Sequence, residues 1–131
     1  MANELTIGEK NIVSLVSDNP LGDLIKPLSH EILLFDSYVA GAAQIKDESV
    51  FDDVKGGAKL ILQREPENRF DENAILVLDE KKRRLGYIPE KDNIVFARLM
   101  DAGKYLTAKV KNYEPKGAFR QINISIYLVD F

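Results

Sequence analysis

The stretch from Arg64 to Val77, REPENRFDENAILV, places an aromatic ring directly beside a carboxylate, at Phe70 and Asp71. A carboxylate accepts hydrogen bonds from hydroxyl groups and repels phosphates, whereas a planar ring can stack on another planar group. Cationic and amide side chains that can bind anions or polar groups flank the pair: Arg64, Arg69, Asn68 and Asn73. These residue types together raise the question of whether the loop binds a ligand.

The same residues have a purely structural alternative. Aspartate and asparagine side chains commonly accept hydrogen bonds from nearby backbone amides, so Asp71 and Asn73 can simply order the loop. Phe70 can likewise be a half-buried packing residue. The sequence leaves both readings of the loop open.

The composition argues against most catalytic sites. The chain has no cysteine and a single histidine, His30, which excludes thiolate zinc sites and leaves no serine–histidine pair. Asp71, Glu80 and Lys82 imitate the Asp…Glu-x-Lys arrangement of magnesium-dependent nucleases. Glu80 and Lys82 fall in an expected hairpin tip, however, where nothing would hold them against Asp71. We predict that the protein is not an enzyme and uses no cofactor or metal.

Length and charge indicate one globular domain with an uneven surface. The chain has 131 residues, 45% of them apolar, and a net charge of −3. Residues 1–54 contain 3 basic and 10 acidic side chains, and residues 55–131 contain 15 and 11, so a polyanion can be attracted locally. No apolar run approaches the roughly 18 residues of a membrane span. We expect a soluble cytoplasmic protein without a membrane partner.

The elements that must position these residues are mostly strands. A capping-box spacing at Thr6–Glu9 predicts a helix over 7–17, within a helical appendage over residues 1–33. From Glu31 onward, runs of branched residues between turn residues predict short strands. A helical face predicts a helix over 90–102 that ends at Gly103, and a second short helix is expected over 48–54. The predicted strands cover residues 32–41, 59–63, 74–78, 84–88, 105–113 and 119–129.

The last of these strands has the clearest pattern. Ile122, Ile124, Ile126 and Leu128 alternate with residues of the opposite face, so the isoleucine face should be the core. About six short strands with one or two inserted helices predict a mainly β (α+β) fold. We expect a small OB-like or SH3-like β-barrel.

Four segments resemble a HIRAN domain: VAG at 39–41, LQREPENRFDENAILV at 62–77, LGYIP at 85–89 and AFRQINISIYL at 118–128. The resemblance covers residues 34–131 as one barrel domain. The family is best known as an accessory domain of SWI/SNF-type DNA translocases that remodel stalled replication forks, and it also occurs as stand-alone bacterial proteins, which this chain is similar to.

The resemblance implies an OB-like barrel that captures the 3′-hydroxyl end of single-stranded DNA, with a role in DNA repair or fork processing. Asn68, Phe70, Asp71 and Phe119 then fall at positions that line the family's pocket. Stacking of bases on aromatic rings tolerates any sequence, and cations near the end would contact phosphates. The predicted DNA-binding residues are Arg64, Asn68, Arg69, Phe70, Asp71, Asn73, Tyr87, Phe119 and Arg120, and Lys81 to Arg84 are further candidates for phosphate contacts.

Two departures from the family pattern predict weak or altered DNA binding. After VAG, DNA-binding members carry a basic residue and tyrosines, whereas this chain has Ala42, Ala43, Gln44 and Ile45. After GYIP, those members carry lysines, whereas this chain has Glu90, Lys91 and Asp92. The alternative prediction is a protein-interaction domain, which would contact a DNA-processing protein through the same barrel face or the acidic N-terminal segment.

Overall fold

The computed structural model describes residues 30–116 and 119–130, and only the backbone of Lys116 and Phe119. Glu31–Val129 forms one compact unit. The predicted helix over 7–17 lies outside the described residues. Residues 30–33, which the prediction placed in the helical appendage, are instead part of a strand. The rest of the appendage and the domain boundary at residue 34 stay predictions.

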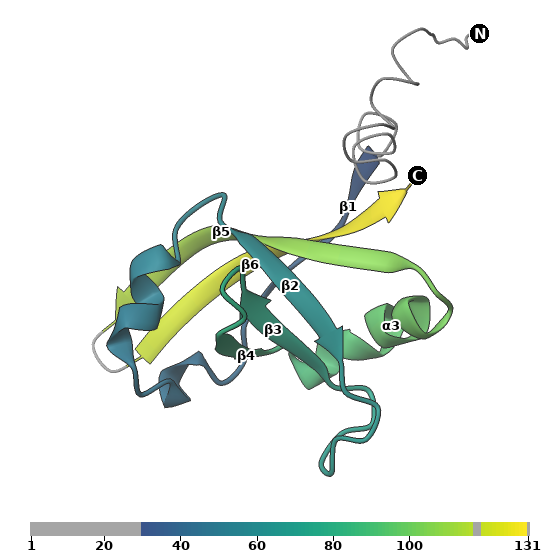
Figure 1. Ribbon diagram of the computed structural model, residues 1–131, viewed down its shortest axis with the longest axis horizontal. Helices are drawn as coiled ribbons and strands as arrows, with labels where there is room; N and C mark the ends of the chain where they lie inside the picture. The colour runs from purple at the N-terminus through teal and green to yellow at the C-terminus, as the bar shows by residue number, and fades with distance from the viewer. Residues whose placement is uncertain (1–29, 117–118, 131) are drawn as a thin grey trace, which may run out of the picture. The chain divides into compact units, whose positions relative to one another are not determined.

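Six strands form one sheet in the order β1-β6-β5-β2-β3-β4 (Figure 1). The pairs β2–β3, β3–β4 and β5–β6 are antiparallel, as expected for strands joined by short links, and the pair β2–β5 is antiparallel as well. This arrangement confirms the predicted mainly β fold of the small OB-like kind. The strands are β1 (His30–Tyr38), β2 (Lys59–Arg64), β3 (Ile75–Asp79), β4 (Arg84–Tyr87), β5 (Tyr105–Lys116) and β6 (Phe119–Asp130).

A single bridge brings the two edges of the sheet together. Just after β1, the amide of Ala40 donates to the carbonyl of Tyr87 on β4 over 2.8 Å, and the amide of Tyr87 donates back over 2.9 Å. The neighbouring Gly86 has a φ of 154°, and a Cβ on it would lie 2.2 Å from the carbonyl oxygen of Ala40. The glycine of LGYIP is therefore required for the two edges to meet.

The barrel core contains the residues that alternation predicted. Ile122, Ile124 and Ile126 of β6 are fully buried, and Leu128 packs against the same cluster. Ser125, which alternation assigned to the outer face, is also buried. Its hydroxyl donates a 2.7 Å hydrogen bond to Asp36 of β1, so it remains satisfied in that place.

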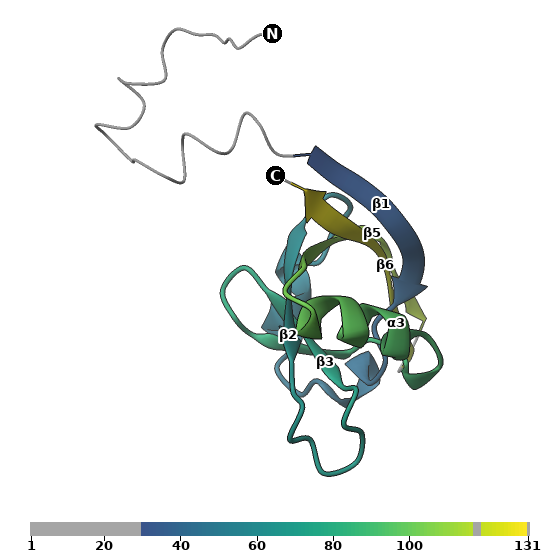
Figure 2. The same cartoon turned by 90° about the vertical axis from the view of Figure 1, so that its right-hand side faces the viewer.

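The helix α3 (Glu90–Asp101) lies where the sequence predicted it (Figure 2). Gly103 has a φ of 91° and follows the helix end, as expected of a left-handed terminating glycine. Phe96 is buried in the core, but Ile94 and Val95 are exposed, so the predicted apolar face was wrong at these two positions. The predicted helix over 48–54 is the 3-10 helix η3 (Glu48–Asp53), preceded by the short η2 (Ala42–Gln44).

Among the described residues, no helix has the length and apolar character needed to cross a membrane. The cytoplasmic location stays a prediction.

Candidate functional site

The loop between β2 and β3 is ordered by its own polar side chains. Oδ1 of Asn68 accepts hydrogen bonds from the backbone amides of Phe70 and Asp71, at 2.9 and 3.1 Å. Oδ1 of Asp71 accepts from the amide of Asn73 at 2.9 Å. The structural alternative is thus correct for Asp71, whereas the side chain of Asn73 accepts a hydrogen bond from Arg98 and not from a nearby backbone amide. Because the backbone is held in this way, the ring of Phe70 remains outside the core and is 93% exposed.

A hollow of about 500 Å³ lies beside this loop. It combines four of the predicted binding residues with residues of β4 and the start of α3. Its lining comprises Ala40, Asn68, Phe70, Asp71, Ala74, Arg84, Tyr87, Ile88 and Glu90. The predicted acid and ring are therefore both next to a space that a ligand can enter.

The carboxylate of Asp71 is anchored but keeps the capacity to bind. Its Oδ2 accepts a 2.7 Å hydrogen bond from the side-chain amide of Asn93 on α3, and Asn93 is buried. Each carboxylate oxygen can accept more than one hydrogen bond, and Asp71 is only partly buried. Asp71 can therefore accept a hydrogen bond from a hydroxyl in the hollow without losing the contacts that orient it.

Hydrogen bonds also fix Tyr87, another residue that lines the hollow. The hydroxyl of Tyr87 donates to Oε1 of Glu65 over 2.7 Å, and the side-chain amide of Asn68 donates to the same oxygen over 3.0 Å. These bonds lower the pKa of Glu65, the bond from Asn68 having the larger effect. Burial, followed by the bond to Glu65, raises the pKa of Tyr87. Tyr87 therefore keeps its proton and a fixed ring position.

Arg84 lies on the rim of the hollow beside that tyrosine. Its guanidinium is 5.4 Å from the centre of the Tyr87 ring, and Nη2 donates a 2.6 Å hydrogen bond to the Tyr87 hydroxyl. No ion pair joins Arg84 to a carboxylate within the described part of the chain. This cation is consequently oriented without a direct ion pair, although its charge contributes to the lowered pKa of Glu65, to which the Tyr87 hydroxyl connects it.

Two of the predicted phosphate contacts instead connect parts of the fold. Arg64 makes two hydrogen bonds to Asp101 at the end of α3, at 2.8 and 3.0 Å, and a third to the carbonyl of Ala74. Arg120 donates to the hydroxyl of Tyr113 and to Glu48 at 2.6 and 2.5 Å. Neither arginine lines the hollow.

The other predicted residues differ in their surroundings. The side chain of Asn73 accepts a 3.0 Å hydrogen bond from Arg98 of α3. Arg69 is exposed in the loop. The side chain of Phe119 lies outside the described residues. The assignment of Arg64, Arg120 and these three residues to DNA contact stays a prediction.

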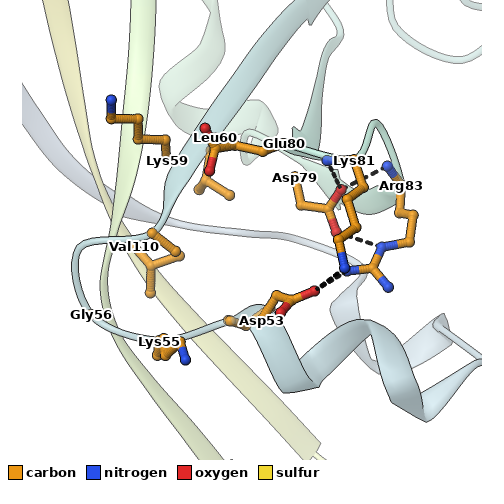
Figure 3. A pocket seen from close by; sticks show the side chains of 12 residues that line it. Asp53, Lys55, Gly56, Lys59, Leu60, Asp79, Glu80, Lys81, Arg83 and Val110 are labelled. Carbon is orange, nitrogen blue, oxygen red and sulfur yellow. Dashed lines mark hydrogen bonds and ion pairs between the residues drawn. The ribbon is translucent and has the colours of Figure 1, made fainter.

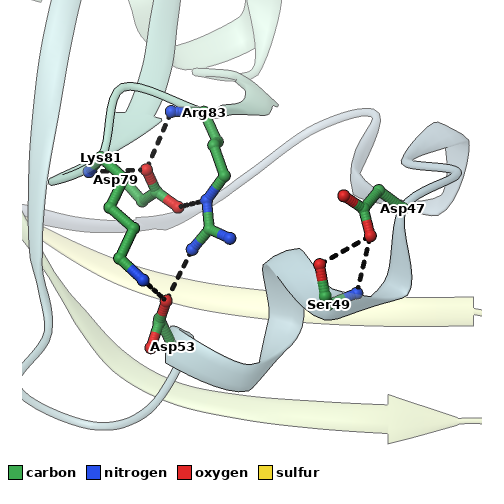
Figure 4. A network of polar contacts seen from close by, with 6 residues as sticks. All are labelled: Asp47, Ser49, Asp53, Asp79, Lys81 and Arg83. Carbon is green, nitrogen blue, oxygen red and sulfur yellow. Dashed lines mark hydrogen bonds and ion pairs between the residues drawn. The ribbon is translucent and has the colours of Figure 1, made fainter.

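A separate hollow of about 350 Å³ lies between η3 and the β3–β4 turn (Figure 3). Oδ1 of the buried Asp79 accepts from the amides of Lys81 and Arg83, and Oδ2 accepts from the Arg83 side chain over 2.7 Å (Figure 4). Arg83 and Lys81 also bind Asp53 of η3, at 2.6 and 3.1 Å. This network fixes the turn, so the charges of Lys81 and Arg83 are largely used by the fold.

The nuclease-like residues do not meet. Asp71 lines the first hollow, whereas Glu80 lines the one between η3 and the β3–β4 turn. In the part of the chain that the structure describes, no three His, Cys, Asp or Glu side chains are grouped so that they could hold a metal ion.

Sequence reasoning missed three residues of the first hollow and its supports: Glu65, Glu90 and Asn93. Glu65 stands in the quoted REPEN segment, but its role depends on Tyr87, 22 residues away. Asn93 was detectable in principle, because it is a polar residue three positions before Phe96 on the core face of a predicted helix.

The matched family and solved structures agree with this fold. The HIRAN domain family model matches residues 32–129, and a comparison with curated proteins found no match. A crystal structure of a protein from Lactobacillus plantarum is 26% identical with a TM-score of 0.73, covering 79% of this chain and 99% of that chain. The crystal structure of the human HLTF HIRAN domain is 21% identical with a TM-score of 0.59, covering 76% and 79%.

A third structure, the NMR structure of the HLTF HIRAN domain in its DNA-bound conformation, is 20% identical with a TM-score of 0.52, covering 74% of this chain and 78% of that chain. At these identities the two HLTF structures show a shared fold. Because the family model spans most of the sequence, this chain belongs to the HIRAN domain family.

Proposed function

We propose that this protein is a nucleic-acid-binding module that holds the 3′ end of single-stranded DNA in the hollow beside the β2–β3 loop. The observation that carries the proposal is the pairing of an almost fully exposed ring, Phe70, with the oriented carboxylate of Asp71. The DNA-bound conformation of the HLTF HIRAN domain, which has the same fold, supports a nucleic-acid ligand for that family member.

The acids of the hollow favour a free strand end. Asp71 and Glu90 both line it, against the single cation Arg84. Two carboxylates repel a phosphate, but either can accept a hydrogen bond from a 3′-hydroxyl. A terminal nucleotide is therefore favoured over an internal one or over a phosphorylated end.

The ring of Phe70 supplies attraction that does not depend on sequence. Stacking of a base on an aromatic side chain contributes about 1–3 kcal/mol. An exposed phenylalanine on an ordered loop is suited to this, since little of the loop has to be rearranged when a base binds.

The test is fluorescence anisotropy with short oligothymidines that carry the dye at the 5′ end. We expect the strand with a 3′-hydroxyl to bind more tightly than the same strand with a 3′-phosphate, and both to weaken as salt rises. Equal affinity for the two ends would remove the role of Asp71. The absence of binding to either strand would overturn the proposal.

A second candidate function is protein recognition, and it rests on exposed apolar side chains. Leu33 and Phe35 of β1 and Ile94 and Val95 of α3 are between 44% and 60% exposed. Phe35 lies 5.9 Å from Phe96, measured between ring centres, so β1 and α3 are adjacent. If neither DNA end binds, we expect Val95→Asp to abolish association with a protein partner; unchanged association would exclude this surface.

A further inference from the structure

Another hollow, here called the second hollow and distinct from the one between η3 and the β3–β4 turn, adjoins the hollow beside the β2–β3 loop, here called the first hollow, along β4. Its volume is about 420 Å³, and it shares Ala40, Arg84 and Tyr87 with the first hollow. Arg84 and Tyr87 thus form a wall between the two spaces. The other lining residues of the second hollow are Gly41, Gln44, Ile45, Lys46, Asp47, Val50, Arg83, Leu85 and Gly86.

The two hollows differ in the sign of their charge. The first contains two carboxylates and one cation. The second contains three cations, Lys46, Arg83 and Arg84, and one carboxylate, Asp47. A ligand that spans both would therefore meet an acidic end and then a basic stretch.

Only two of these cations are available to a ligand. Arg83 is bound to Asp79 and Asp53 (Figure 4). Asp47 accepts hydrogen bonds from the amide and hydroxyl of Ser49, at 3.0 and 2.7 Å, and so begins η3. Lys46 is exposed, and within the described residues neither Lys46 nor Arg84 forms an ion pair.

We propose that Lys46 and Arg84 hold the phosphate backbone of the DNA strand whose 3′ end lies in the first hollow. This inference rests on the proposed function and specifies the path that the strand takes toward its 3′ end. The strand passes through the basic hollow beside Lys46, crosses the Arg84–Tyr87 wall and ends at Asp71.

The geometry of Arg84 fits this role. Its Nη2 is occupied by the Tyr87 hydroxyl, and the guanidinium is held near the Tyr87 ring. In the described part of the structure, the remaining guanidinium N–H groups have no hydrogen-bond partner. They can therefore donate to phosphate oxygens, which arginine binds with charge-assisted hydrogen bonds.

The test compares strands of two lengths. A dinucleotide ending in a 3′-hydroxyl should occupy the first hollow and extend little beyond it. A strand of about 8 nucleotides lies within the range that one such fold can bind, and it can fill both hollows. We expect wild-type protein to bind the longer strand more tightly, and Lys46→Ala to remove most of that gain while changing dinucleotide affinity by less than about twofold.

The dependence on salt supplies a second readout. Loss of one phosphate contact should reduce the slope of log K against log salt by about 0.7 for a single strand. Lys104→Ala is the matched control, since it removes the same charge from an exposed position that lines neither hollow. Arg84→Gln should reduce the slope as Lys46→Ala does.

The outcomes separate this inference from the proposed function. If wild-type protein prefers the 3′-hydroxyl end but Lys46→Ala and Arg84→Gln bind the longer strand as wild type does, the path along β4 is wrong and end recognition stands. If Lys104→Ala weakens binding of the longer strand as much as Lys46→Ala does, the effect of Lys46 is one of general charge and the path is again wrong. If the wild type shows no end preference, the proposed function itself fails.

Discussion

The side-chain amide of Asn93 donates a 2.7 Å hydrogen bond to Oδ2 of Asp71 and so joins α3 to the β2–β3 loop. Asn93 is buried, and its partner is the acid at the edge of the candidate site. The orientation of Asp71 therefore depends on a residue of α3 that lies 22 positions later in the chain, and not on the loop alone.

Removing that donor should weaken the fold. We expect Asn93→Ala to lower the free energy of unfolding by about 1–3 kcal/mol, because a carboxylate loses a buried partner. Urea denaturation measures the effect. Asn112→Ala is a control, since its side chain accepts a hydrogen bond from Asn123 on an exposed surface and should change stability by less than about 0.5 kcal/mol. Equal losses in both variants would contradict a special role for Asn93.

Phe70→Ala should separate binding from stability. The ring is 93% exposed, so urea denaturation should show a change of less than about 0.5 kcal/mol. Loss of the stacking contact should weaken the affinity for single-stranded DNA by about 5- to 150-fold in an anisotropy titration, whatever the base. A variant that is destabilised but binds normally would show that the ring serves packing.

Asp71→Asn tests the end preference. The substitution keeps the shape of the side chain but removes the charge that repels phosphate. We expect the affinities for 3′-hydroxyl and 3′-phosphate strands to become equal, mainly through tighter binding of the phosphate. A preference that persists in competition anisotropy would assign the discrimination to Glu90, the other acid of the hollow.

Gly86→Ala should disrupt the meeting of the two sheet edges. A Cβ at this position would lie 2.2 Å from the carbonyl oxygen of Ala40. Gly41→Ala is a suitable comparison, because Gly41 also has a positive φ, 88°, but nothing lies within 4 Å of its added Cβ. We expect the alanine at 41 to lower stability by about 1–2 kcal/mol and the alanine at 86 by clearly more. Similar melting temperatures for the two variants would contradict the steric argument.

Low pH should lower the free energy of unfolding in part because Glu65, which anchors Tyr87, becomes protonated. Hydrogen bonds from Asn68 and Tyr87 hold the pKa of Glu65 below its usual 4.5 in the folded protein. The stabilisation from this group is therefore complete above about pH 4.5 and is lost as pH falls through the lowered folded pKa. Urea denaturation between about pH 3 and pH 7 should show that the free energy of unfolding falls less on acidification in Glu65→Gln than in wild type. Identical pH profiles would exclude Glu65 as a contributor.

The local spacing of apolar residues in the sequence was sufficient to predict most strands and the main helix. The alternation of Ile122, Ile124 and Ile126 predicted the buried face of β6, and the apolar spacing before Gly103 predicted α3. These features follow from the periods of strands and helices, which neighbouring residues determine by themselves. The exposure of Ile94 and Val95 did not follow, because it depends on which partner each helix face meets.

The candidate site was predicted only in part, for the same reason. Asn68, Phe70, Asp71 and Tyr87 were identified from residue types together with the resemblance to HIRAN domains, and they border one hollow. Their chemistry is local: a ring, an acid and amides in one loop and one neighbouring strand.

Tertiary structure alone decided how the charges are used. Arg64 and Arg120 looked like free cations in the sequence, yet folding brings Asp101 to the first and Glu48 to the second. Lys46, which no motif distinguished, lines the hollow that also contains Asp47, but within the described residues no carboxylate forms an ion pair with it. A sequence determines which side chains carry charge, but whether a charge is neutralised depends on residues that only the folded chain places beside it.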